Sequence, residues 1–246
     1  MYDKNLFTKF IEKYYLNGLI NGAQLTSEKG DLHTVFRNSE GNVRGEIKLE
    51  KINLPDGIIG VYYTSNLLKM ISVLHDEVSI EYKGSRPEDN SVIALEMRDK
   101  KGRKATHATS MLELIDYDGK KGVVKDYEIK IKLDNETIQD ILKAFSAINT
   151  PMDSQTITIL KKDNKLYAVF GYSGSNVDQI EIELNGEVDE DYDEILSFPG
   201  SAVKEILSVN GKSFNEAKLN ISIKGLMQFK FEEDGLTAEY WLRKNN

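Results

Sequence analysis

The chain of 246 residues contains no cysteine and only three histidines, four prolines and one tryptophan. The absence of cysteine excludes disulfides, thiol catalysis and cysteine-ligated metal sites, and it is typical of a reducing compartment. No run approaches the roughly 18 apolar residues of a membrane span. The N-terminus carries charged residues where a signal peptide has a continuous apolar core. We therefore expect a cytoplasmic protein, in the host cytoplasm if it is viral, with no membrane partner.

Positive charge is also scarce. Lysine and arginine total 32 against 40 acidic residues, so the net charge is −8. A field of this sign repels phosphate backbones. Proteins that hold DNA by adsorption alone depend on basic side chains that release counterions, and this composition disfavours that class.

Catalytic signatures are missing as well. The histidines His33, His75 and His107 are scattered without metal-ligand spacing. Residues 171–175 (GYSGS) have the wrong order for a nucleophile elbow and predict a hairpin turn. The acidic run 189–194 lacks the spacing and the glycine of a calcium loop, which favours a solvated turn. No phosphate-binding glycine loop is present. We expect neither an enzyme nor a cofactor nor a metal site.

The chain does contain an internal repeat. Residues 62–74 (YYTSNLLKMISVL) and 198–210 (FPGSAVKEILSVN) share apolar residues at i, i+3 and i+4, which predicts two amphipathic helices. Residues 3–14 and 134–145 form a second matching pair, and each opens with an aspartate in the N-cap position. The same two helices recur in the same order at nearly the same spacing, which indicates duplication.

Alternating segments between these helices predict short antiparallel strands bounded by turn residues. The predicted strands are 32–37, 45–52, 58–63, 77–82, 92–97, 104–109, 127–133, 155–160, 165–172, 179–184, 218–224, 227–232 and 237–242. Residues 116–126 (DYDGKKGVVKD) are rich in glycine and charge, which is typical of a linker. The expected fold class is α+β, with domains at 1–120 and 121–246. Each domain should have antiparallel sheets with two helices on one face.

Two helix–strand repeats in a small, acidic, cysteine-free chain resemble the sliding clamps of DNA replication, and in detail the polymerase processivity factors of tailed bacteriophages, which have a PCNA-like fold. The resemblance rests on residues 133–159 (LDNETIQDILKAFSAINTPMDSQTITI), on 67–82 (LLKMISVLHDEVSIEY) and on the alternation of 227–242. Residues 86–109 and the long, tyrosine-rich first helix depart from that pattern, and the role of 86–109 stays open.

The resemblance implies a homotrimeric ring of six similar domains, with helices lining a hole around duplex DNA. Such a ring would tether the replicative DNA polymerase, and its further partners would be a clamp loader and the transcription machinery. Exposed edge strands that pair head to tail would close it. A β-rich viral structural or assembly protein that oligomerises through the same edges, without encircling DNA, is the alternative.

Basic side chains on or beside the outward faces of the helices, or in a basic turn near residue 100, are candidates for loose phosphate contact. They are Lys9, Lys13, Lys69, Lys143, Lys204, Lys100 and Arg103. Glu12, Asp140 and Glu205 share the helix faces, and plain solvation of these lysines is the alternative.

A resemblance to clamps also implies a groove beside the linker for a partner peptide with apolar anchors. The candidates are apolar or aromatic residues of the linker region and the last strand. They are Ile115, Tyr117, Val123, Val124, Tyr240 and Trp241. For Trp241, a core or interface position is the alternative.

Overall fold

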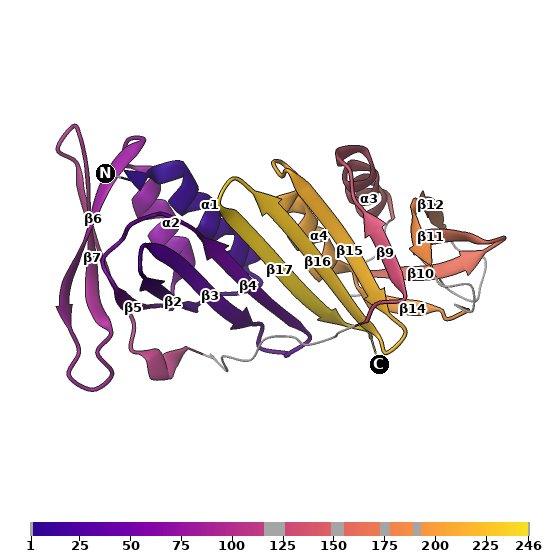
Figure 1. Ribbon diagram of the computed structural model, residues 1–246, viewed down its shortest axis with the longest axis horizontal. Coiled ribbons are helices and arrows are strands. Elements are labelled where there is room, and N and C mark those ends of the chain that lie inside the picture. The colour runs from indigo at the N-terminus through magenta and orange to yellow at the C-terminus, as the bar shows by residue number, and fades with distance from the viewer. Residues whose placement is uncertain (1, 116–125, 149–154, 173–177, 189–192, 246) are drawn as a thin grey trace. The chain divides into compact units, whose positions relative to one another are not determined.

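The computed structural model in Figure 1 describes residues 2–115, 126–148, 155–172, 178–188 and 193–245. By their contacts, the described residues form two compact units. Unit 1 comprises residues 2–41, 45–115 and 235–238, and unit 2 comprises residues 42–44, the described residues of 126–234, and 239–245. The predicted boundary between 120 and 121 lies outside the described residues, as does the linker apart from Asp126, so the division into 1–120 and 121–246 stays a prediction.

Unit 1 begins with a strand and a helix and then alternates strands with a second helix. Its elements are β1 (Tyr2–Asp3), α1 (Lys4–Tyr15), the 3-10 turn η1 (Leu16–Gly18), β2 (Ala23–Glu28), β3 (Asp31–Arg37), β4 (Val43–Leu49), β5 (Gly57–Val61), α2 (Thr64–Ser72), β6 (Glu77–Ser85), β7 (Val92–Asp99), β8 (Lys104–Ala108) and η2 (Leu112–Leu114). One sheet has the order β1-β6-β7-β8, and β4-β3-β2-β5 are neighbours in another. Helix α1 packs beside α2 (Figure 1).

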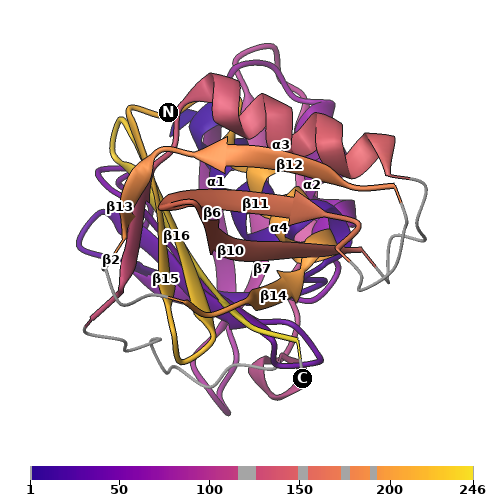
Figure 2. The same ribbon diagram turned by 90° about the vertical axis from the view of Figure 1, so that its right-hand side faces the viewer.

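Unit 2 repeats this order. The first two residues of β4 belong to unit 2 and the first three of the last strand to unit 1, and each strand is described with the unit that holds most of it. Its elements are β9 (Ile129–Lys132), α3 (Asn135–Ala147), β10 (Thr156–Lys162), β11 (Lys165–Phe170), β12 (Ile180–Leu184), β13 (Gly186–Val188), β14 (Leu196–Pro199), α4 (Gly200–Asn210), β15 (Glu216–Ser222), β16 (Leu226–Glu233) and β17 (Leu236–Arg243). One sheet has the order β12-β11-β10-β14, and β13-β9-β15-β16-β17 are neighbours in another. Helix α3 lies along β11 and β12 (Figure 2), and α4 contacts β10 and β14.

The helices form where the periodicity predicts them. The carboxylates of Asp3 and Asp134 accept hydrogen bonds from the amides of Asn5 and Thr137, each at 2.8 Å, so both predicted N-caps are confirmed. Their apolar faces are buried in the two units. The buried apolar residues of the four helices are Phe7, Phe10, Ile11, Tyr14, Leu67, Ile71, Ile138, Ile141, Ala144, Phe145, Ala202, Val203, Ile206 and Leu207.

Tight turns set the strand registers. Asp163 and Asn164 both have positive φ, 53° and 59°, between the paired residues Lys162 and Lys165 of β10 and β11. Two positive φ angles in a two-residue loop are the geometry of a type I′ hairpin, whose twist matches the strands. Because side chains alternate across a strand, this register decides which residues face the helices.

Several boundaries differ from the sequence-based expectation. Strands β1, β2, β13 and β14 were not predicted. Strand β2 has a polar residue, Ser27, at one of its buried positions, so the alternation of apolar and polar residues in its sequence is weak. Helices α2 and α4 begin at Thr64 and Gly200, two residues later than predicted, because in the second copy the apolar Phe198 belongs to β14. Among the described residues, no helix is long and apolar enough to cross a membrane.

Candidate nucleic-acid and partner surfaces

The helix lysines differ in how far they reach solvent. Lys69 and Lys143 are exposed, and the ammonium group of Lys143 lies 2.9 Å from Asp140. Lys9 and Lys204 are half-buried. Lys13 is only 3% exposed, so the prediction that it lies on an outward face is wrong. One i, i+3 step from Phe10 places it at the edge of the apolar face, where packing covers it.

Asp99 organises the basic turn that follows β7. Its Oδ1 accepts hydrogen bonds from the amides of Lys101 and Arg103, each at 2.9 Å, and its Oδ2 accepts one from the amide of His75 at 3.0 Å. Burial alone would raise the pKa of Asp99, but these three hydrogen bonds lower it overall. The turn therefore has a fixed shape before any ligand binds.

Two of the predicted phosphate contacts in this turn already have protein partners. The guanidinium group of Arg103 donates to the carbonyl oxygen of Val73, just after α2, at 2.8 Å. The ammonium group of Lys100 pairs with Glu77. A phosphate that met this turn would compete with both interactions, which favours weak contact.

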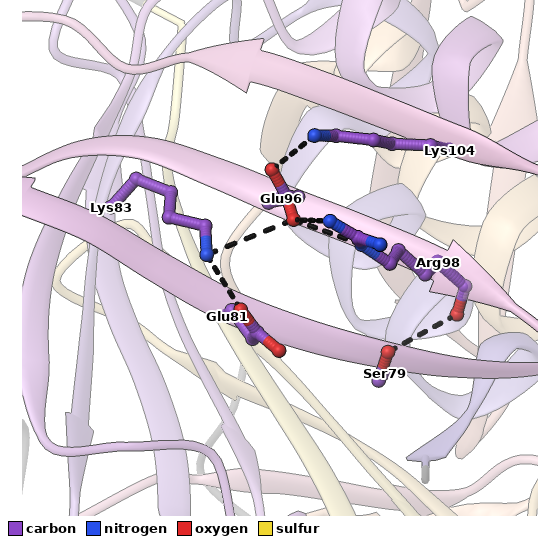
Figure 3. Close-up of polar contacts among 6 residues, drawn as sticks. All are labelled: Ser79, Glu81, Lys83, Glu96, Arg98 and Lys104. Carbon is purple, nitrogen blue, oxygen red and sulfur yellow. Dashed lines mark hydrogen bonds and ion pairs between the residues drawn. The ribbon is translucent and has the colours of Figure 1, made fainter.

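A second charged cluster crosses the sheet β6-β7-β8 (Figure 3) and was not predicted. Its centre is Glu96, whose side chain is 8% exposed; its carboxylate lies 2.6 Å from Lys104, 2.7 Å from Arg98 and 3.7 Å from Lys83. Lys83 also pairs with Glu81 at 2.6 Å. Hydrogen bonds from Lys104 and then Arg98 lower the pKa of Glu96 to about 2. The i, i+2 spacing of Glu96 and Arg98 places both side chains on one face of β7. Lys83 and Lys104 lie on the neighbouring strands, so only strand pairing brings them close to Glu96.

Of the strands that end a sheet among the described residues, β8 and β12 carry side chains of opposite charge. Strand β8 ends the sheet of unit 1 and exposes Lys104 on its edge. Strand β12 ends a sheet of unit 2 and exposes Glu181 and Glu183, the latter paired with Lys165 at 2.8 Å. Charged side chains protect such edges from unspecific pairing.

Three of the predicted groove residues lie among the described residues, and all three are buried. Tyr240 is 0% exposed, so its assignment as an exposed anchor is wrong, because strand alternation turns it toward the helices. Trp241 and Ile115 are also buried, at 6% and 8% exposure. Tyr117, Val123 and Val124 lie outside the described residues.

Tyr127 was not predicted, yet it is half-buried beside Trp241, and burial raises its pKa. It lines a pocket of about 520 Å³ on the strands β9, β13 and β15, where the charged lining consists of Lys130, Lys132, Lys218 and one acidic residue, Glu187. An aromatic ring beside three lysines suits a peptide that carries both apolar and acidic side chains. Local sequence could not reveal this group, since β9 and β15 are far apart in the chain.

In the part of the chain that the structure describes, no three His, Asp or Glu side chains gather as a metal site. His107 is buried on β8, which lowers its pKa. The predicted turns at 171–175 and 189–194 lie largely outside the described residues.

The arrangement of strands and helices is that of known solved structures, although no family model and no curated protein matches the sequence. Proliferating cellular nuclear antigen (PCNA) from Entamoeba histolytica has a TM-score of 0.75 at 14% identity, covering 99% of this chain and 96% of that one. A structure of the C-terminal region of FEN-1 bound to A. fulgidus PCNA has a TM-score of 0.75 at 15% identity, covering 100% and 97%. The predicted PCNA-like fold is confirmed.

Proposed function

We propose that the chain is a DNA sliding clamp, in which three copies close a ring of six similar units around duplex DNA and tether the replicative polymerase. The likeness to PCNA, over nearly the whole of both chains, carries this proposal. The repeated order of helices and strands supports it, because two similar units in each of three chains make a symmetric ring. The clamps of tailed bacteriophages, working in the host cytoplasm, are the group we propose.

Edge strands β8 and β12 of neighbouring copies would close this ring. Each ends its sheet among the described residues, so each offers backbone groups to a second chain. Lys104 on β8 would meet the acidic Glu181 and Glu183 of β12, which favours this head-to-tail contact over pairing of like edges.

Contact with DNA would be weak in such a ring. The net charge of −8 opposes adsorption, so encirclement would do the retaining. The basic side chains that we propose for loose contact are the exposed or half-buried ones. They are Lys9, Lys69, Lys143, Lys204, Lys100 and Arg103.

Partner proteins would bind through short peptides. The A. fulgidus PCNA structure carries the C-terminal region of FEN-1. We propose that polymerase, clamp loader and transcription proteins bind this chain at Tyr127 and Trp241, with Ile115, Tyr117, Val123 and Val124 as further candidates. The lysine-lined pocket beside Tyr127 would hold acidic residues of such peptides.

Light scattering across a range of concentrations tests the ring. We expect a species of three times the 27.9 kDa of one chain. The trimer should remain on nicked circular DNA and leave the same DNA once it is cut to a linear form. Open or larger assemblies that bind circular and linear DNA alike would instead support the viral assembly protein. A monomer at every concentration, with or without a loader, would reject the ring.

A charge exchange tests the edges. Lys104→Glu, or Glu181→Lys with Glu183→Lys, should weaken trimer assembly about tenfold, equivalent to about 1.4 kcal/mol. The three changes together should restore assembly, because opposite charges meet again. Glu187→Lys, on the edge strand β13, is the matched control and should have no effect. If the triple variant assembles into trimers more weakly than the variants of either strand alone, the proposed pairing is wrong.

A further inference from the structure

Unit 1 has its own small pocket, which shares Ile115 with the candidate peptide groove described above. It has a volume of about 280 Å³ and lies among the loop before β2, the end of β3, the junction of β5 with α2, and the end of η2 with the residue that follows it. Ile20, Tyr62, Leu114 and Ile115 supply its apolar lining. Pockets for drug-sized ligands begin at about 300 Å³, so this one suits a single large side chain.

Exposed apolar side chains line this pocket or lie close in the chain to residues that line it. Tyr62 is 41% and Leu114 58% exposed, and Tyr63 and Met111 are exposed as well. The rings of Tyr62 and Tyr63 meet edge to face, with centroids 4.9 Å apart and an interplanar angle of 89°. Such a contact limits how the two rings can turn. Rigid exposed tyrosines beside a pocket are typical of a protein-binding surface.

The walls of the pocket are held in place by backbone contacts. The hydroxyl group of Thr64 donates to the carbonyl oxygen of Asn21 at 2.9 Å, and its amide donates to the same oxygen at 3.2 Å. A Cβ atom on Gly22 would lie 2.6 Å from the carbonyl oxygen of Val61, so only glycine permits this close approach. A ligand would therefore meet a wall that is already formed, which lowers the entropic cost of binding.

Arg37 gives this pocket its charge. Among the described residues that line it, Arg37 alone is charged, and it stands beside the buried Asn38. The planar donors of its guanidinium group match a carboxylate in two parallel hydrogen bonds. The pocket thus combines an apolar recess with a group that selects acidic ligands.

We propose that this pocket docks a segment of a partner protein in which a leucine or phenylalanine follows an aspartate or glutamate. The apolar side chain enters between Tyr62 and Leu114, and the carboxylate binds Arg37. This inference goes beyond the proposed function and requires neither a ring nor DNA. It assigns unit 1 a docking site of its own, whereas Tyr127 and Trp241 belong to unit 2.

Methyl NMR of the full chain, in whatever assembly it forms, tests the site with two synthetic peptides. The first is acetyl-Asp-Leu-Phe-Gly-amide, and the second has asparagine in place of the aspartate. We expect the first peptide to shift the methyl signals of Leu114 and Ile115 at millimolar concentration. The second should bind at least about threefold more weakly, because it lacks the carboxylate. Equal binding of both peptides, or shifts confined to other methyl groups, would overturn the proposal.

Variants separate the pocket from unspecific adsorption. Tyr62→Ala should weaken binding of the first peptide about fivefold to tenfold, the range expected when an interface residue contributing over 1 kcal/mol is truncated. Tyr172→Ala is the matched control, since Tyr172 in unit 2 is 40% exposed. Arg37→Gln should reduce the difference between the two peptides. Equal binding to the Tyr62→Ala and Tyr172→Ala variants would reject the site. The solution mass of both variants reports separately on the ring.

Discussion

Helices α2 and α4 occupy matching positions in the two units. Each is contacted by a buried tyrosine hydroxyl group from another element, at its start in unit 1 and at its end in unit 2. In unit 1, Tyr14 of α1 contacts the hydroxyl group of Thr64 at 3.2 Å, at the start of α2. In unit 2, the hydroxyl group of Tyr240 of β17 accepts a hydrogen bond from the side-chain amide of Asn210, at the end of α4, at 3.0 Å. Burial raises the pKa of both tyrosines. The apolar spacing of the helices is repeated, but the polar contact that ties the second helix down is not.

Truncation of the shared apolar face should have the largest effect. Leu67→Ala should lower the free energy of unfolding by about 2–5 kcal/mol, the usual range for a fully buried leucine. Val203→Ala, at the matching position of α4, should cost about 1 kcal/mol less, because valine has one methylene fewer. Urea unfolding followed by circular dichroism measures both. Ser72→Ala, an exposed position of α2, is the control. A larger loss at Val203 than at Leu67 would show that the two faces are not packed alike.

Removal of the tyrosine hydroxyl groups should have a smaller and unequal effect. Tyr240→Phe should cost about 1–3 kcal/mol, because one hydrogen of the buried Asn210 amide loses its acceptor while the other still binds the carbonyl oxygen of Ile206 at 2.8 Å. Tyr14→Phe should cost less, since Thr64 still donates to Asn21. The same urea experiment ranks the two variants. Equal losses would mean that the two hydroxyl groups, despite their different partners, contribute alike.

Removal of the charge of Glu96 in unit 1 should have the smallest effect on stability. The effect should appear only at pH values above the acid range in which Glu96 is protonated. The pKa of Glu96 is about 2 in the fold against an ordinary value of 4.5, so its stabilising contribution is complete above pH 4.5 and is lost as the pH falls toward 2. Its basic partners are about half exposed, and solvent screens them. Glu96→Gln should therefore lower the melting temperature at pH 7 and approach the unmodified protein at pH 3.

Glu183→Gln is the control for this titration, because it breaks an exposed ion pair with Lys165 in unit 2. It should change the melting temperature less than Glu96→Gln at pH 7. A difference between the Glu96 variant and the unmodified protein that persists unchanged to pH 3 would contradict the assigned pKa.

The sequence by itself determined the features that depend on near neighbours in the chain. Apolar residues three and four apart fixed the helix faces, and an aspartate before each repeat fixed the N-caps of α1 and α3, because both effects act within one or two turns. Alternation likewise located most strands. The PCNA-like fold was expected from the resemblance to sliding clamps, and the exposure of Lys69 and Lys143 followed from the helix faces.

Tertiary structure decided what depends on residues far apart in the chain. Packing buried Lys13 at the margin of its helix face, and strand register turned Tyr240 inward. Pairing of β7 with β6 and β8 gathered cations around Glu96, and the meeting of four segments formed the pocket at Tyr62. Each of these outcomes requires knowing which strands pair and in what register. Local spacing cannot supply that, because a shift of one residue in register moves every side chain to the opposite face of the sheet.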